Sequence, residues 1–131
     1  MSGTYEIELP RRPEAAGYAR DWMATLDIPL PADRLHDLIL LANELVTNAL
    51  VHARGNGKIV LRIHVQGKTV RVEVSDPGEG TTGPRVKKAR PLDTSGRGLS
   101  MVGEVATRWG WQSENLTNVW FELDRRLPVN R

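Results

Sequence analysis

The chain has no cysteine among its 131 residues. This absence excludes disulfide bonds and thiolate metal sites, and it is compatible with a reducing compartment. Long hydrophobic runs are also missing. The longest run, Leu38–Ala42, is far too short to span a bilayer, and residues 1–13 lack the apolar core of a signal peptide. We therefore expect a cytoplasmic protein that does not contact a membrane.

An excess of one charge is also missing, because 18 Lys and Arg residues balance 16 Asp and Glu residues and leave a formal net charge of +2. The sequence has no extended basic stripe and no recognition-helix pattern, so it does not favour direct contact with nucleic acid. A nucleic-acid binder would have to use Arg85, Lys87, Lys88, Arg90 and Arg97, and its binding would fall steeply with salt. The length and the hydrophobic content of 40% predict one domain over residues 1–131.

The hydrophobic pattern predicts an ordered set of strands and helices. Alternating apolar residues predict strands at residues 4–9, 59–65, 70–74, 109–111 and 118–124. Helical spacing predicts helices at 13–26 and 32–53, and a third helix that begins at Gly96. Residues 81–95 lack periodicity, and a loop of that length is typical of a lid or a binding segment. This order indicates an α+β two-layer sandwich, in which about three helices cover one face of a mixed, mostly antiparallel sheet of about five strands.

The longer predicted helix carries three polar residues, Glu44, Asn48 and His52, at a spacing of four residues on one helical face. Asparagine is a mediocre helix former, so its place in a largely apolar helix needs an explanation. A carboxamide oxygen suits Mg2+, and Glu44 one turn away can take a proton from an attacking hydroxyl or water. The alternative is a solvated stripe on an amphipathic helix, and for His52 we favour a structural role.

A second patch begins with Asp76, at the end of the second hairpin strand, and continues with Gly78 and Gly80. An ionised carboxylate only accepts hydrogen bonds, so Asp76 can accept one from an exocyclic amine such as that of adenine. The glycines let a ligand approach the backbone closely. An ordinary turn explains the same residues, because Asp-Pro and glycine clusters are common in turns.

A third patch, Gly96–Leu99, opens the third predicted helix after the basic loop. Backbone N–H groups at a helix N-terminus, together with Arg97, favour anionic phosphates. The patch is not a Rossmann fingerprint, because Met101 stands where the third glycine is required. Nor does Gly78 begin a P-loop, because residues 84–85 are Pro-Arg in place of Lys and Ser or Thr. The three patches together indicate a nucleotide pocket.

In this order and spacing, the patches resemble the nucleotide-binding boxes of the histidine-kinase-like ATPase superfamily. The similarity includes four segments: Leu9–Pro13, Glu44–Ala53, Thr107–Gly110 and Val119–Leu123. The sequence is most similar to a small stand-alone branch, the anti-sigma factor serine/threonine kinases and the related actinobacterial ATP-binding regulators. The resemblance implies the Bergerat ATP-binding fold, with ATP and Mg2+ as cofactors and an ATP lid at about residues 81–96.

The resemblance also implies a role for each matching residue. Glu44 would be the catalytic base, Asn48 the magnesium ligand and Asp76 the acceptor for the adenine amine. The other residues that it assigns to the nucleotide are Gly78, Gly80, Gly96, Arg97, Gly98, Leu99 and Asn118. Asn118 is a departure, because relatives often have Thr directly before the Val-Trp-Phe of the last strand, and a contact beneath the adenine can therefore differ.

For function, the resemblance implies that the protein phosphorylates a Ser or Thr of a STAS-type anti-sigma factor antagonist with Mg-ATP and sequesters a sigma factor. Catalysis would rest on positioning and charge neutralisation. The alternative is an ATP-gated protein-binding module with little or no phosphoryl transfer, in which ATP orders the lid and reshapes a partner surface. Related kinases are often dimeric, so a homodimer is also implied, although one core can absorb the apolar faces of this chain.

Overall fold

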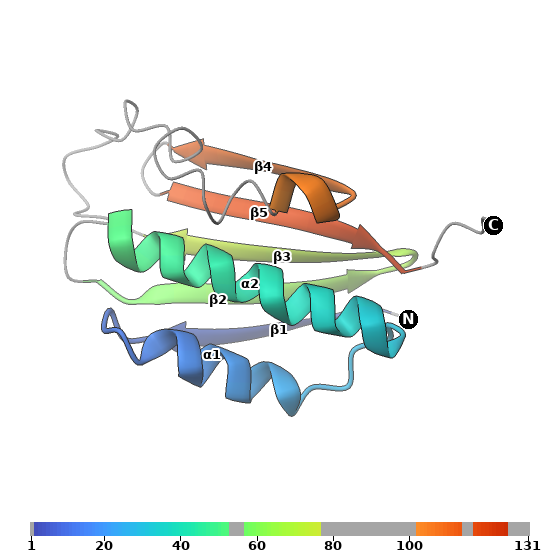
Figure 1. Cartoon of the computed structure of the whole chain (residues 1–131), viewed down its shortest axis with the longest axis horizontal. Coiled ribbons are helices and arrows are strands. Elements are labelled where there is room, and N and C mark those ends of the chain that lie inside the picture. The colour runs from blue at the N-terminus through green and yellow to red at the C-terminus, as the bar shows by residue number, and fades with distance from the viewer. Residues whose placement is uncertain (1, 53–56, 77–101, 114–116, 126–131) are drawn as a thin grey trace.

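The computed structural model describes residues 2–52, 57–76, 102–113 and 117–125 of the chain (Figure 1). The elements are β1 (Ser2–Leu9), α1 (Ala15–Ala24), α2 (Ala32–His52), β2 (Ile59–Gln66), β3 (Thr69–Asp76), β4 (Arg108–Ser113) and β5 (Thr117–Asp124), with a short helical segment at residues 102–105. The predicted order is confirmed. Helix α1 begins two residues later than predicted, because the Ala15 N–H donates to the Arg12 carbonyl (2.9 Å) in a turn that precedes the helix.

The described strands form one sheet in the order β1-β2-β3-β5-β4, and every neighbouring pair in it is antiparallel. The α+β sandwich is confirmed, and the described strands are fully antiparallel where a mixed, mostly antiparallel sheet was predicted. Two connections explain the antiparallel pairing of β1, β2 and β3. A tight turn with Gly67 at φ +58° joins β2 to β3. Helices α1 and α2 run along the sheet and back, so β2 starts at the end where β1 finishes (Figure 1).

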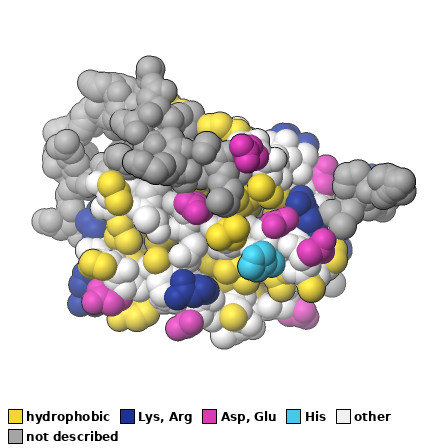
Figure 2. Space-filling model, in the orientation of Figure 1, with side chains coloured by type: hydrophobic (Ala, Val, Ile, Leu, Met, Phe, Trp, Pro, Cys, Tyr) yellow, Lys and Arg dark blue, Asp and Glu magenta, His cyan; other side chains and the backbone are white. Residues whose placement is uncertain are grey.

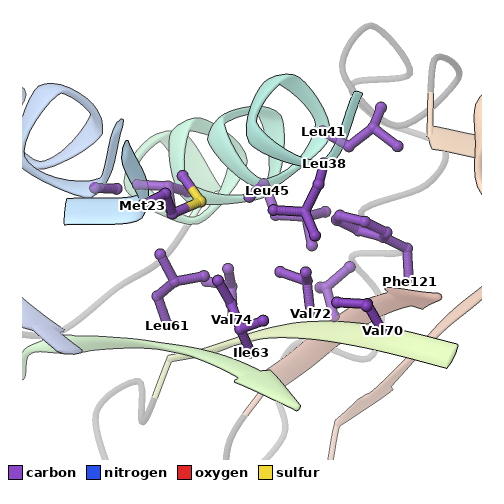
Figure 3. Close-up of a cluster of buried hydrophobic side chains, with 14 of the residues drawn as sticks. Met23, Leu38, Leu41, Leu45, Leu61, Ile63, Val70, Val72, Val74 and Phe121 are labelled. Atoms are coloured by element: carbon purple, nitrogen blue, oxygen red, sulfur yellow. The ribbon is translucent and has the colours of Figure 1, made fainter. Parts of the chain in front are cut away.

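Both helices lie on one face of the sheet, and the hydrophobic core fills the space between the two layers (Figure 1). The amide nitrogen of Asn43 on α2 donates to the Ala16 carbonyl of α1 at 3.0 Å and links the helices. The core side chains come from every layer, as Figure 3 shows: Met23, Leu38, Leu41 and Leu45 from the helices face Leu61, Ile63, Val70, Val72, Val74 and Phe121 from the sheet. The helix-covered face is therefore the buried face of the sheet.

The opposite face of the sheet carries a network of charged side chains, and we call it the charged face. Arg71 donates to Glu73 at 2.8 Å and to Glu122 at 2.9 Å, and Arg108 donates to Glu122 at 2.6 Å. The guanidinium carbon of Arg71 lies 4.0 Å from the ring centroid of Trp120, which is a cation–π geometry. Residues on β3 and β5 therefore alternate between the core and this network.

The helix side of the molecule has a mixed surface. In the view of Figure 2, the described Lys and Arg side chains are interspersed with Asp and Glu side chains. Three large hydrophobic residues of the two helices are exposed, namely Tyr18 on α1 and Leu40 and Val51 on α2. None of the helices in the described part of the chain combines the length and the apolar character needed to cross a membrane.

Candidate functional site

The elements that carry the predicted site residues meet at one end of the sheet. Strands β1 and β3 finish there, β2 and β5 start there, and the C-terminal end of α2 lies over the same end (Figure 1). The strand register shows the alignment, because Leu9 pairs with Ile59 and Asp76 pairs with Thr117. Helix α2 also packs against β3. The fold thus brings the helix that carries Glu44 and Asn48 to the strand that ends in Asp76.

Asp76 is a buried carboxylate at the end of an apolar series. Val70, Val72 and Val74 point from β3 into the core, and Asp76 follows at the same two-residue spacing with only 6% of its surface exposed. Burying a charge is costly unless it is paired. Arg11 is one such partner, and its Nη2 donates to the Asp76 Oδ1 at 2.5 Å. The structure therefore presents a hydrogen-bond acceptor at this position, with Arg11 as a cationic partner.

Arg11 is a site residue that the sequence analysis missed. It follows β1, its side chain is 15% exposed, and its Nε donates to the Gly57 carbonyl at 3.0 Å. Arg11 thereby ties three segments together, namely the residues after β1, the residues before β2 and the end of β3. The segment Leu9–Pro13 is part of the family resemblance, but nothing in the sequence distinguishes Arg11 from the exposed Arg12 beside it.

Asn118 lies on the charged face, which is the side of the sheet away from Asp76. Its Oδ1 accepts a hydrogen bond from the Ser75 Oγ at 2.9 Å, and the Arg62 Nη1 donates to the same Ser75 oxygen at 3.4 Å. The structure therefore does not bring Asn118 together with Asp76. The strand position opposite Asp76 is Thr117. The two-residue alternation of β5 contained this signal, because residue 117 is in phase with the core residues of that strand.

Glu44 and Asn48 are half-buried on α2, one helical turn apart. Within the described part of the chain, neither side chain takes part in a hydrogen bond or an ion pair. Asn43 on the same helix is different, because its amide is used to hold α1. The helix thus contains one asparagine with a structural role and a Glu-Asn pair whose polar atoms are uncommitted among the described residues. Those atoms are able to bind a ligand.

Several predicted site residues lie outside the described part of the chain. They are Gly78, Gly80, Gly96, Arg97, Gly98 and Leu99, together with the lid at about residues 81–96. The side chain of His52 also lies outside it. Across the described ranges, no group of three or more His, Asp or Glu residues could hold a metal ion. Of the third predicted helix, the buried Val102 belongs to the core.

Comparison of the sequence with known protein families identifies a matching family. A family model described as the histidine kinase-like ATPase domain matches residues 9–122. The match begins at the last residue of β1 and ends within β5, so it contains Arg11, the whole of α2 and Asp76. The comparison with curated proteins finds no match.

Proposed function

We propose that this protein, which belongs to the histidine kinase-like ATPase domain family, is a Mg-ATP-binding regulator that phosphorylates a Ser or Thr of a partner protein. Membership of the family implies ATP binding. The observation that carries the proposal is the convergence on one end of the sheet of a buried carboxylate, Asp76, and a helix with the uncommitted Glu44 and Asn48. The two elements are far apart in sequence and in direct contact in the fold.

The described residues fit an adenine nucleotide with its metal. The Asp76 carboxylate is an acceptor for an exocyclic amine, and Thr117 is the neighbouring strand position. The Asn48 carboxamide would be the protein ligand of Mg2+, an ion that keeps several waters and shares phosphate oxygens. When bound, the ion neutralises charge on the transferred phosphoryl group. A site of this kind does not need a cluster of acidic residues.

Glu44 supplies the general base that phosphoryl transfer needs. In the transfer, the hydroxyl oxygen of the partner forms a new bond to the γ-phosphorus, the bond to the bridging oxygen breaks and ADP leaves. Glu44 accepts the hydroxyl proton as the new bond forms. Glu44 is half-buried and lies one turn from Asn48, so the proposed base and the proposed magnesium ligand lie on the same stretch of α2.

The identity of the partners rests on the resemblance of the sequence motifs. They are similar to those of anti-sigma factor kinases, so the proposed substrate is a STAS-type antagonist and the proposed sequestered protein is a sigma factor. The same resemblance supports a homodimer. An ATP-gated binding module without phosphoryl transfer would use the same residues, and the experiment below separates the two.

The first test measures nucleotide binding. Isothermal titration of Mg-ATP into wild type, Asp76→Asn and the control Thr47→Ala separates a base contact from a general effect, because Thr47 is exposed on the same helix as Asn48. We expect Asp76→Asn to weaken binding about tenfold or more, since one hydrogen bond to a charged group is lost, and Thr47→Ala to bind like wild type. Wild type that binds no ATP would contradict the proposal.

The second test measures phosphoryl transfer. Labelled Mg-ATP is incubated with candidate STAS-type antagonists and with wild type, Glu44→Gln or Thr47→Ala. We expect Glu44→Gln to bind ATP normally while phosphorylation falls by about a hundredfold or more, because removing a general base costs that much. If wild type phosphorylates no antagonist but ATP still changes its affinity for a partner, the kinase proposal is wrong and the binding module is supported.

A further inference from the structure

Arg11 makes contacts that a surface arginine does not need. Its side chain is largely buried, one nitrogen donates to the Asp76 carboxylate and a second donates to the Gly57 carbonyl. The third nitrogen, Nη1, is buried and has no hydrogen-bond partner among the described residues. Arg12, the next residue, is exposed. The guanidinium is therefore held in a fixed position, with its charge directed at one carboxylate.

Two hydrogen bonds, one to the Gly57 carbonyl and one to the Asp76 carboxylate, fix the guanidinium of Arg11. The guanidinium is planar and rigid, so a hydrogen bond from Nε to the backbone of residue 57 also sets the direction of Nη2. Nη2 then sets the position of the Asp76 Oδ1, because a charge-assisted hydrogen bond is short and directional. Loss of Arg11 would remove the charged contact that restrains the Asp76 Oδ1. A residue 65 positions away in the sequence thus contributes to the orientation of Asp76.

We propose that Arg11 is a positioning residue that makes the site selective for a 6-aminopurine, by holding the Asp76 carboxylate in the orientation that accepts the amine. This inference rests on the proposed function, because it assumes that Asp76 reads the base. An acceptor discriminates between bases only when its geometry is held by its surroundings. Arg11 acts through Asp76, so its loss affects the recognition of the amine and not the binding of the phosphates.

The test compares two ligands that differ only at the amine. ATP and purine riboside triphosphate, which has hydrogen in place of the 6-amino group, are titrated with Mg2+ into wild type, Arg11→Gln, Arg11→Lys and the control Arg12→Gln. The measured quantity is the ratio of the two dissociation constants. Thermal unfolding of each variant is recorded first, and titrations are run below the melting transition. A purely structural role would weaken both ligands together and leave the ratio unchanged.

For wild type and Arg12→Gln we expect ATP to bind about 10- to 100-fold more tightly than the analogue, as one hydrogen bond to a charged group provides. In Arg11→Gln we expect the ratio to fall to within about threefold of one, while the affinity for the analogue changes by less than about threefold. Arg11→Lys keeps the positive charge but not the rigid fork, so we expect an intermediate ratio.

The outcomes separate this inference from the proposed function. If wild type itself does not prefer ATP, Asp76 does not read the amine and the proposed base contact is wrong. If wild type prefers ATP and folded Arg11→Gln retains or increases that preference, Arg11 does not position Asp76 and the inference is overturned. If Arg11→Gln does not fold, Arg11→Lys decides: an unchanged ratio overturns the inference and a lowered ratio supports it.

Discussion

Gly110 offers a sharp test of how the charged face is packed. It lies on the edge strand β4 opposite Trp120 of β5. A Cβ added at Gly110 would lie 2.9 Å from the Trp120 Cζ2, closer than real Cβ atoms approach other atoms, and 3.1 Å from its Cε2, which is also tight. The indole cannot move away without cost, because Arg71 stacks on the ring at 4.0 Å. We therefore expect Gly110→Ala to destabilise the protein.

The magnitude follows from two opposing terms. Forcing extra volume into a packed site costs about 1–3 kcal/mol, whereas replacing a strand glycine by alanine gains about 0.5–1 kcal/mol of backbone entropy. Gly3 on the opposite edge strand is the matched control, because nothing lies within 4 Å of a Cβ built there. Gly3→Ala keeps only the gain, so the two variants should differ by about 1–3 kcal/mol in free energy of unfolding.

The assay is urea or thermal unfolding of wild type, Gly3→Ala, Gly110→Ala and Trp120→Leu. A double variant, Gly110→Ala with Trp120→Leu, completes the cycle. Each kcal/mol corresponds to about 3–5 °C in melting temperature for a domain of this size. Removing the ring should remove most of the penalty at Gly110. The reasoning is refuted if Gly110→Ala is as stable as Gly3→Ala, or if its penalty is the same with leucine at position 120.

Two further predictions concern charge and hydrogen bonding. Burial is the largest single effect on Glu122, and it raises the pKa of the carboxyl group. Hydrogen bonds and charge attraction from Arg108 and Arg71 together outweigh burial, so the pKa lies below its usual 4.5. The unfolded chain then binds the proton more readily than the folded protein, so this stabilisation is present above pH 4.5 and is lost as the pH falls through the folded pKa. In Arg108→Gln, we expect the free energy of unfolding to depend less steeply on pH in this range. Urea unfolding of wild type and variant at several pH values measures the difference. Asn43→Ala should lower the free energy of unfolding by about 1 kcal/mol, whereas Asn48→Ala should leave it nearly unchanged and weaken Mg-ATP binding in calorimetry.

The fold was largely predictable because its signals are local. Strands β2 and β3 alternate apolar and polar residues from Leu61 to Gln66 and from Thr69 to Ser75, and Gly67 marks the turn between them. The wide apolar stripe of α2 likewise predicted a buried helix, and its observed bounds are within one residue of the prediction. The purely antiparallel pairing was less accessible, because it depends on the directions of the connecting helices and not on any pattern within a strand.

The site was predictable only where a residue type stands out from its surroundings. Asn48 in an apolar helix and Asp76 at the end of a valine series are both such residues, and the fold brings their elements together. Arg11 is one of two adjacent arginines, and its role depends on contacts with segments 46 and 65 positions away. The family pattern points to Asn118, whereas the strand register places Thr117 opposite Asp76.

Packing alone does not explain the ion pair between Arg11 and Asp76. The inward series of β3 would be completed equally well by another valine, and replacing a buried ion pair by apolar residues of similar volume is often neutral or stabilising. Removing only one partner is costly, because it leaves an uncompensated buried charge. The pair is therefore expensive to alter one residue at a time and adds little to packing, and a role in reading a ligand accounts for its presence better than a role in stability does.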